Sequence, residues 1–272
     1  IGSALRNLDI PYIVAPHDPF HPSLFESKRL TRWFYWHLFE KRMLEHACAV
    51  QILDERHKTW LQRRGIHRPV VVTPNGFDSD NVPPSAELSW SCSKELKLIF
   101  LGRLDVHNKG LDLLLEALAA FDKKFNLTLQ GPNQEGAAPL ETLADKLDLR
   151  EKVFIKTPDY SKSSTQIMAD YDVFCLPSRF EGFGLAALEA MLTARVLLVS
   201  DIAGIAPHVR NADCGVTVEP TPQSICAGLE TLFARKSEWR EMGLRGRNYA
   251  LKHLHWNEIA AKALAEYEKV LS

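Results

Sequence analysis

The stretch Asp172-Val-Phe-Cys-Leu-Pro-Ser-Arg-Phe-Glu-Gly-Phe-Gly-Leu-Ala-Ala-Leu-Glu-Ala-Met-Leu192 decides the fold, because it reads as a strand, a turn and a helix in succession. Asp172–Leu176 is almost wholly apolar, which is typical of a strand covered on both faces of a parallel sheet. Leu185–Leu192 has apolar residues at helical spacing. Pro177–Gly184 is the turn between them, and its two glycines allow the backbone to approach a ligand closely.

The same alternation of short apolar runs and helical patterns extends along the chain and predicts a parallel α/β architecture. The other predicted strands are Tyr12–Ala15, Ala49–Leu53, Val70–Thr73, Leu96–Leu101, Leu127–Gln130, Val153–Lys156, Val196–Ser200 and Val216–Val218. The other predicted helices are Gly110–Phe121, Pro139–Leu147, Pro222–Ala234 and Trp256–Leu271.

A break in composition at Asp78–Ser93, with two adjacent prolines and several serines, predicts an interdomain linker. The sequence after it supplies six strands with intervening helices, enough for a complete doubly wound, Rossmann-like domain. The sequence before it supplies three, which predicts that the N-terminal half of that first domain is missing. We therefore expect the end of a first domain at 1–80, a linker at 81–95, a second domain at 96–250 and a terminal helix within 251–272.

Composition excludes several classes of protein. With 272 residues, 46% apolar and 25% charged, the chain has the composition of a soluble globular protein. Its formal net charge of −1 gives no global field for nucleic acid or an anionic membrane, so a bound anion needs a local group of donors. No apolar run approaches the roughly 18 to 20 residues that span a bilayer. Five scattered cysteines without a CxxC pair predict free thiols in a reducing cytosol.

A first group of candidate site residues follows the strand Leu96–Leu101. The strand ends at Gly102, Arg103 and Lys109 flank a short loop, and a helix starts near Gly110. Arginine offers a planar fork of donors and lysine a mobile point charge, a pairing that suits a pyrophosphate. The helix N-terminus adds N–H groups and a partial positive charge. Two solvated surface cations are the alternative for this loop taken alone.

A second group comes from the opening stretch. Glu181 lies in the turn and Glu189 in the helix, beside Leu185 and two further leucines that we expect to face the core. A carboxylate beside an apolar face needs a partner, which a ribose diol or a structural salt bridge would supply. Gly131-Pro-Asn133 is a turn after a third strand. Because the carboxyl ends of parallel strands meet at one sheet edge, we expect these groups to lie together.

An alternative is a dinucleotide site. Gly182-Phe-Gly-Leu-Ala-Ala187 fits the G-x-G-x-x-G/A fingerprint, and Asp201 closes the next strand at nearly the distance expected for a ribose contact. Against it, five residues separate the strand from the first glycine, three strands of the same domain precede it, and Arg103 and Lys109 are left without a role. An NAD-dependent dehydrogenase is thus the less favoured alternative.

At these residues the sequence resembles the GT-B glycosyltransferases of family 4, the retaining and metal-independent group. The matching pieces are Thr73-Pro-Asn-Gly-Phe-Asp78, Gly102-Arg103 with Lys109-Gly110, Leu176–Ala190 with its E-x7-E pattern, and Ser200-Asp-Ile-Ala-Gly204. Their order and spacing agree over residues 70–220. The resemblance implies that the terminal helix 256–271 packs back on the first domain.

The resemblance also implies roles for the site residues. Arg103 and Lys109 would hold the donor diphosphate and stabilise the leaving group without a divalent metal. Glu181 would face the sugar hydroxyls and Glu189 the ribose. The remaining donor-binding positions are Gly102, Gly131, Gly182, Phe183, Gly184 and Leu185.

The first segment resembles the family more loosely. Ile10–Phe20 is similar to a stretch in which many members read Pro-His-Gly, which implies that His17 approaches the donor sugar, although Asp18 stands where glycine is usual. Arg32–His46 reads as an amphipathic helix rich in aromatic and basic residues. We expect those aromatics to pack in the core, and contact with a lipid-linked acceptor or a membrane surface is the alternative.

The site residues and the resemblance together imply retaining transfer of a hexose-type sugar from a UDP or GDP sugar to a saccharide or lipid-linked acceptor. The prediction includes no metal, no other cofactor and no nucleic acid partner. We expect the protein in the cytoplasm, and contact with the inner face of the membrane stays open. A nucleotide-binding fragment without catalytic activity is the non-enzyme alternative.

Overall fold

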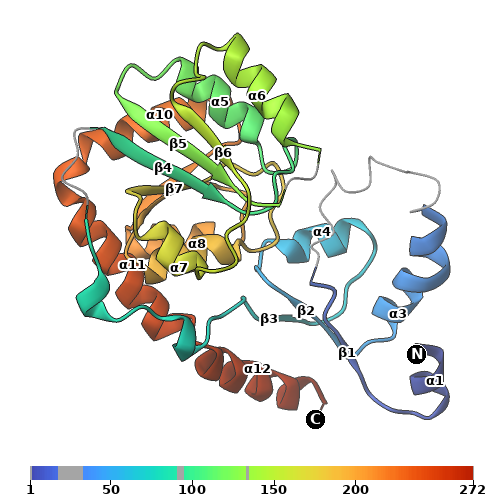
Figure 1. The fold of residues 1–272 in the computed structure, drawn as a ribbon. Coiled ribbons are helices and arrows are strands. Elements are labelled where there is room, and N and C mark those ends of the chain that lie inside the picture. Colours follow the sequence, from blue (N-terminus) through green and yellow to red (C-terminus); the bar gives the residue numbers. More distant parts are fainter. Residues whose placement is uncertain (1, 18–32, 91–94, 133–134, 272) are drawn as a thin grey trace. The chain divides into compact units, whose positions relative to one another are not determined.

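The computed structural model describes residues 2–17, 33–90, 95–132 and 135–271 (Figure 1). The chain divides into two compact units, one formed by residues 1–75 with 256–272 and the other by residues 76–255. Each has its own parallel sheet, and they are called unit 1 and unit 2 below.

Unit 1 contains a three-stranded parallel sheet in the order β1-β2-β3. Its strands are β1 (Ile13–Val14), β2 (Ala49–Ile52) and β3 (Val70–Val72). Its helices are α1 (Gly2–Asn7), the π-helical η2 (Trp36–Glu40), α3 (Lys41–Glu45), α4 (His57–Arg63) and α12 (Trp256–Leu271). In register, Ile13 pairs with Ala49 and Val50 with Val70.

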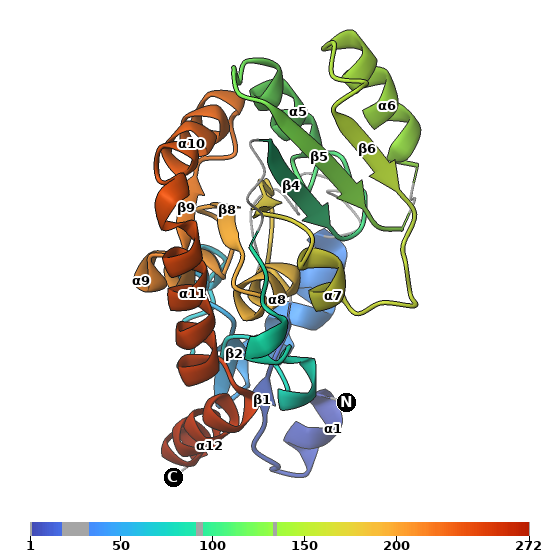
Figure 2. The ribbon, with the colours of Figure 1, turned by 60° about the vertical axis from the view of Figure 1, so that its left-hand side comes forward.

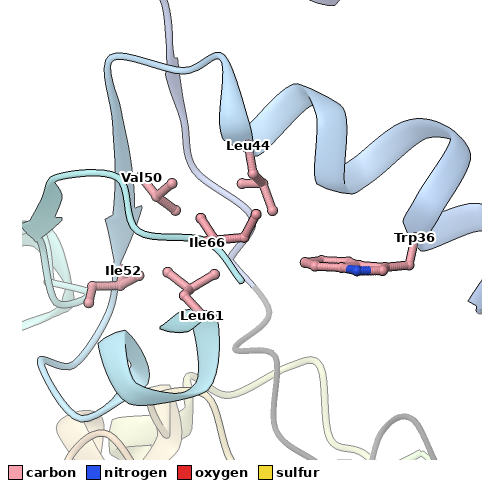
Figure 3. Packing of buried hydrophobic residues seen from close by; sticks show 6 residues of the cluster. All are labelled: Trp36, Leu44, Val50, Ile52, Leu61 and Ile66. Carbon is pink, nitrogen blue, oxygen red and sulfur yellow. The ribbon is translucent and has the colours of Figure 1, made fainter. Parts of the chain in front are cut away.

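The core of unit 1 joins the sheet to its helices (Figure 3). It consists of buried apolar side chains from η2, α3, β2, α4 and the segment after α4, namely Trp36, Leu44, Val50, Ile52, Leu61 and Ile66. Helix α12 lies against β3, buries Ile259 and Ala263, and its Tyr267 hydroxyl donates to the Gln51 side chain of β2. Residues of α12 thus belong to the same compact unit as the three strands β1 to β3.

The aromatic segment before α3 does not pack as expected. Trp36 is 4% exposed, whereas Trp33, Phe34 and Tyr35 are each more than 50% exposed. Trp36 and Leu44 are eight residues apart, which brings both to the one helical face that meets the core. The expectation that the aromatics pack in the core is therefore right for Trp36 and wrong for the other three.

Unit 2 contains a six-stranded parallel sheet in the order β6-β5-β4-β7-β8-β9 (Figures 1 and 2). The strands are β4 (Leu96–Leu101), β5 (Phe125–Gln130), β6 (Val153–Lys156), β7 (Val173–Leu176), β8 (Val196–Ser200) and β9 (Gly215–Val218). Counted along the unit this is the order 3-2-1-4-5-6 of a doubly wound fold. The order reverses between β4 and β7, the two central strands.

Helices cover both faces of this sheet, so most residues of its central strands are buried. Helices α5 (Leu111–Ala119), α6 (Ala137–Lys146) and α10 (Pro222–Ala234) lie on one face. The other face carries α7 (Ser164–Met168), α8 (Leu185–Leu192), α9 (Ala206–Ala212) and α11 (Trp239–His253). Residues of β4, β7 and β8 such as Phe100, Phe174 and Leu197 are 0% exposed.

The described part of the segment interpreted as a linker is bound to unit 2. It contains two short 3-10 turns, η3 (Ser79–Asn81) and η4 (Ser85–Glu87). The buried Arg247 donates from Nη2 to the Pro83 carbonyl at 2.7 Å, and the buried Arg195 donates from Nη2 to the Ser89 carbonyl at 2.5 Å. Two arginines from the body of unit 2 therefore hold this segment along it.

The described cysteines are free thiols, as predicted, namely Cys48, Cys175, Cys214 and Cys226. Cys92 lies outside the described residues. None of the helices that these residues form combines the length and the apolar character needed to cross a membrane.

Candidate functional site

Three of the predicted loops lie at the carboxyl ends of neighbouring strands in unit 2. Gly102 follows β4, Gly131 follows β5, and the turn Pro177–Gly184 follows β7. Since β4 pairs with both β5 and β7, these loops share one sheet edge, at the point where the strand order reverses. Ligands of open α/β sheets bind at this kind of position.

The β4 and β5 loops touch through their backbones. Gly102 N donates to the Gln130 carbonyl at 3.0 Å, and Leu104 N donates to the Pro132 carbonyl at 3.3 Å. A Cβ atom added to Gly131 would overlap the Gly102 carbonyl oxygen. Glycine at 131 is thus required for the two loops to approach this closely, while Asn133, predicted beside it, lies outside the described residues.

The loop that carries Arg103 and Lys109 is a tight turn. Asp105 accepts hydrogen bonds from the backbone and side-chain nitrogens of Asn108, at 3.1 and 2.7 Å. Lys109 N donates to the Asp105 carbonyl at 2.9 Å. Gly110, at the N-cap of α5, has φ of 64°, and a side chain there would overlap the Pro177 carbonyl. The loop therefore closes directly on the turn after β7.

Lys109 and Glu181 meet across these two loops. Lys109 Nζ donates to Glu181 Oε2 at 2.7 Å, and the two side chains are 21% and 14% exposed. From the sequence these residues are predicted to contact different parts of a donor, and in the structure they form one ion pair. Arg103, on the same loop as Lys109, is exposed.

Arg179 reinforces this junction and was not singled out from the sequence. Its guanidinium forms a bidentate pair with Asp112 of α5, with N–O distances of 2.7 and 2.8 Å. Arg179 N and Phe180 N both donate to the Asn108 carbonyl, at 2.9 and 3.3 Å. A pair 67 residues apart leaves no local sequence signal, so only the fold reveals it.

The E-x7-E turn is also held from its other side. Phe183 is buried, its carbonyl accepts from Ile205 N at 2.8 Å, and its ring meets His208 edge-on. A Cβ atom on Gly204 would contact the Gly182 carbonyl. Gly184 is the N-cap of α8 with φ of 104°. The loop after β8 thus fixes the peptide groups that precede this helix N-terminus.

Glu189 lies on α8, and burial raises the pKa of its carboxyl group, while a hydrogen bond from the Ser164 side chain acts in the opposite direction. Within the described part of the chain this hydroxyl is its partner and no ion pair accompanies it, in contrast to the salt-bridge alternative. Ser164 begins α7 and was missed by the sequence analysis.

Leu185 corrects one expectation. It was expected to face the core beside Glu189, but it is 53% exposed. As the first residue of α8, directly after the Gly184 N-cap, it lies at the end of the helix that reaches the site edge rather than along the buried face.

The remaining candidates lie elsewhere. His17 belongs to unit 1, where it follows β1 with φ of 54°, and Asp18 lies outside the described residues. Its role at a donor sugar stays a prediction. Among the residues that the structure describes, no group of three or more histidine, cysteine, aspartate or glutamate side chains is placed to hold a metal ion.

Solved structures share this fold over almost the whole chain. Sucrose-phosphate synthase from Thermosynechococcus elongatus matches 99% of this chain and 71% of its own, with a TM-score of 0.81 and 22% identity. HepE from Anabaena, solved in complex with UDP-glucose, matches 98% of this chain and 75% of its own, with a TM-score of 0.80 and 18% identity. The fold defines the chain as a GT-B type α/β protein, as predicted.

The sequence family is also established. The family model for glycosyl transferases group 1 matches residues 91–249, more than half of the chain, and the chain belongs to this family. This membership supports the glycosyltransferase prediction over the dehydrogenase alternative.

Two curated relatives are mannosyltransferases by name. The MMP alpha-(1->4)-mannosyltransferase of Mycolicibacterium hassiacum is 31% identical over 180 residues, which are 65% of this chain and 44% of the relative. The phosphatidyl-myo-inositol mannosyltransferase of Mycobacterium tuberculosis is 27% identical over 260 residues, 92% of this chain and 66% of the relative. The chain thus spans 44% and 66% of the lengths of these two relatives.

Proposed function

We propose that unit 2 binds a nucleoside diphosphate sugar and that the protein transfers its sugar, with retention of anomeric configuration, to a saccharide or lipid-linked acceptor. The observation that carries this proposal is the Lys109–Glu181 pair at the point where the strand order reverses, beside the N-terminus of α8. A cation, a carboxylate and helix amides in one place match the diphosphate and the hydroxyls of such a donor.

The leaving group of the reaction is the nucleoside diphosphate, on which negative charge grows as the bond to the sugar breaks. Lys109 and Arg103 supply positive charge for it, and the amides at Gly184 and Leu185 supply N–H donors. Lys109 Nζ has three protons, so it can keep its bond to Glu181 and still donate to a phosphate. Glu181 in turn has free acceptor sites for sugar hydroxyls.

The nucleoside part of the donor is assigned to Glu189 and the adjacent turns. A carboxylate accepts hydrogen bonds from both hydroxyls of a ribose diol, which would compensate for the burial that raises the pKa of Glu189. Gly102 and Gly131 let the backbones of the β4 and β5 loops approach each other closely at the same sheet edge.

The donor class is proposed as UDP or GDP sugar, with no metal ion required, because the charge of the diphosphate is met by side chains. The relatives that transfer mannose and the neighbour that binds UDP-glucose support a hexose. The name of one relative, acting on phosphatidyl-myo-inositol, supports a lipid-linked acceptor. A contribution of His17 to transfer is part of the same proposal.

A thermal-shift screen of the chain against UDP, GDP, ADP, their sugars and NAD tests this proposal. We expect a UDP or GDP compound to raise the melting temperature, because ligands that bind only the folded state stabilise it. Lys109→Ala should abolish that shift. Protection by NAD with none by any nucleoside diphosphate would overturn the proposal in favour of a dinucleotide site.

A further inference from the structure

The side chain of Arg179 joins three parts of the site edge. Nη1 and Nη2 donate to the two carboxylate oxygens of Asp112, in the first turn of α5, at 2.7 and 2.8 Å. Nη1 also donates to the His107 carbonyl, at 2.9 Å. The guanidinium thus links its own turn after β7 to α5 and to the loop that leads to Lys109.

The backbone beside Arg179 brings the two ends of the ion pair together. The Asn108 carbonyl, one residue before Lys109, accepts bonds from Arg179 N and Phe180 N. Phe180 directly precedes Glu181, so the chain next to both charged residues is held by the same junction. The Lys109–Glu181 bond of 2.7 Å closes the ring of contacts.

We propose that Arg179 is a positioning residue, which through Asp112 and His107 holds Lys109 where its Nζ reaches the diphosphate of the donor. This inference rests on the proposed function of Lys109. Arginine suits the role because its planar fork fixes a direction as well as a charge, which a lysine at the same position does not do. A small displacement of a group that binds a reacting phosphate has a large effect on its interaction.

The alternative is a surface ion pair that only stabilises the fold, and the chain offers a matched control for it. Arg235 also forms a bidentate pair, with Asp213, at N–O distances of 2.9 and 3.0 Å. The two arginines are similarly exposed, at 26% and 28%. Arg235 follows α10 and also bonds Glu238, and Asp213 also pairs with Arg245. Arg235→Lys therefore shows how unit 2 responds when an arginine fork outside the loops after β4 and β7 is weakened.

The test is a double-mutant cycle of Arg179→Lys and Lys109→Met in the 272-residue chain, read by calorimetric titration with UDP and GDP and with uridine and guanosine. We expect Arg179→Lys to lower the affinity for the nucleoside diphosphates by about tenfold and to leave the affinity for the nucleosides unchanged. In the Lys109→Met background, Arg179→Lys should cause no further loss of affinity. Arg235→Lys should keep the diphosphate affinity within about twofold. Asp112→Asn disrupts the same bidentate pair by removing the carboxylate. It takes the place of Arg179→Lys if the Arg179→Lys variant does not fold.

Three results would overturn the inference: wild-type diphosphate affinity in both Arg179→Lys and Asp112→Asn, an equal loss in the Lys109→Met background, or an equal loss for the nucleosides. These differ from a failure of the proposed function. If the proposed function is wrong, the wild-type chain will bind no nucleoside diphosphate, or the Lys109→Met variant will bind it as tightly as the wild type. Either result would overturn the inference about Arg179 as well.

Discussion

Among the residues that the structure describes, different contacts hold the loops at the carboxyl edges of the two parallel sheets. In unit 2 the loops after neighbouring strands bind one another, through Gly102 and Gly131, and through Arg179 and Asn108. In unit 1, Asp54 follows β2 and forms an ion pair with Arg56 of its own loop. The distance from Asp54 Oδ2 to Arg56 Nη2 is 2.5 Å. The comparison teaches that contacts between neighbouring strand-end loops, added to those within one loop, bring charged side chains of different loops together, as in the Lys109–Glu181 pair.

The largest effect should come from the backbone contact between the β4 and β5 loops. Gly131→Ala forces its Cβ against the Gly102 carbonyl, and we expect unit 2 to lose about 3 kcal/mol of unfolding free energy, since overpacking against backbone is poorly relieved. Urea unfolding followed by circular dichroism measures this. In unit 1, Gly2→Ala is the control, because its Cβ would lie 3.3 Å from the flexible Met43 side chain. Equal stability of the two variants would show that the loop contact is not required.

The next effect concerns the charge that the edge presents. Lys109→Met should weaken nucleoside diphosphate binding by about 30-fold, because hydrogen bonds to charged groups contribute about 2 kcal/mol and Glu181 is left without its cation. Isothermal titration measures the affinity. Lys152→Met removes a lysine of the same unit that lies over the Phe125 ring and should leave binding unchanged. A similar loss in both variants would point to net charge rather than to the site.

Glu189→Gln should separate stability from binding. Burial raises the pKa of Glu189 above its unfolded value, so the charged form weakens folding at neutral pH and this penalty disappears as the pH falls through the unfolded value. We expect the variant to gain about 1 kcal/mol of unfolding free energy at pH 7 and to lose affinity for nucleosides with a ribose diol. Titration with nucleosides and their 2′-deoxy analogues checks the second part. Unchanged preference for ribose would contradict the assigned role.

The smallest effect on nucleotide binding should come from unit 1. Burial acts to raise the pKa of Asp54, but hydrogen bonds from the side chain and backbone of Arg56 outweigh it, and the pKa lies below its ordinary value of 3.8. The pair therefore stabilises the fold above that pH, and this contribution is lost as the pH falls through the lowered pKa. Asp54→Asn should lower the free energy of unfolding by about 1 kcal/mol at pH 7. It should also make that free energy depend less on pH in the acid range. Nucleotide affinity should not change, and a change would weaken the contrast between the two edges.

The strands and the main site motif were predictable from the sequence because they depend on local pattern. Short, mainly apolar runs predict β4, β6 and β8 with the bounds that the structure has. Parallel strands end at one edge, so the loops carrying Lys109 and Glu181 could be expected to lie together. Their direct ion pair, and the Arg179–Asp112 fork beside it, depend on distances between loops that no local pattern carries.

Small residues and the position of a helix end explain two of the differences between the predicted and the observed structure. Helix α11 was not predicted, because its buried face includes Gly243, Gly246 and Ala250, which give no apolar periodicity. Those glycines let the helix approach closely, and a Cβ on Gly243 would overlap the Ala194 carbonyl. Leu185 was placed in the core because a helical pattern does not say where the helix end meets solvent.

The position of α12 has a consequence for the order in which the protein is made. Helix α12 covers β3 of unit 1, yet the ribosome adds it after all of unit 2. Unit 2, residues 76–255, is contiguous and has all its strands and helices before α12 emerges, whereas unit 1 waits for the last residues of this sequence. Domains generally fold as units during synthesis. Unit 1, whose strands precede unit 2 in the chain, is therefore completed after unit 2.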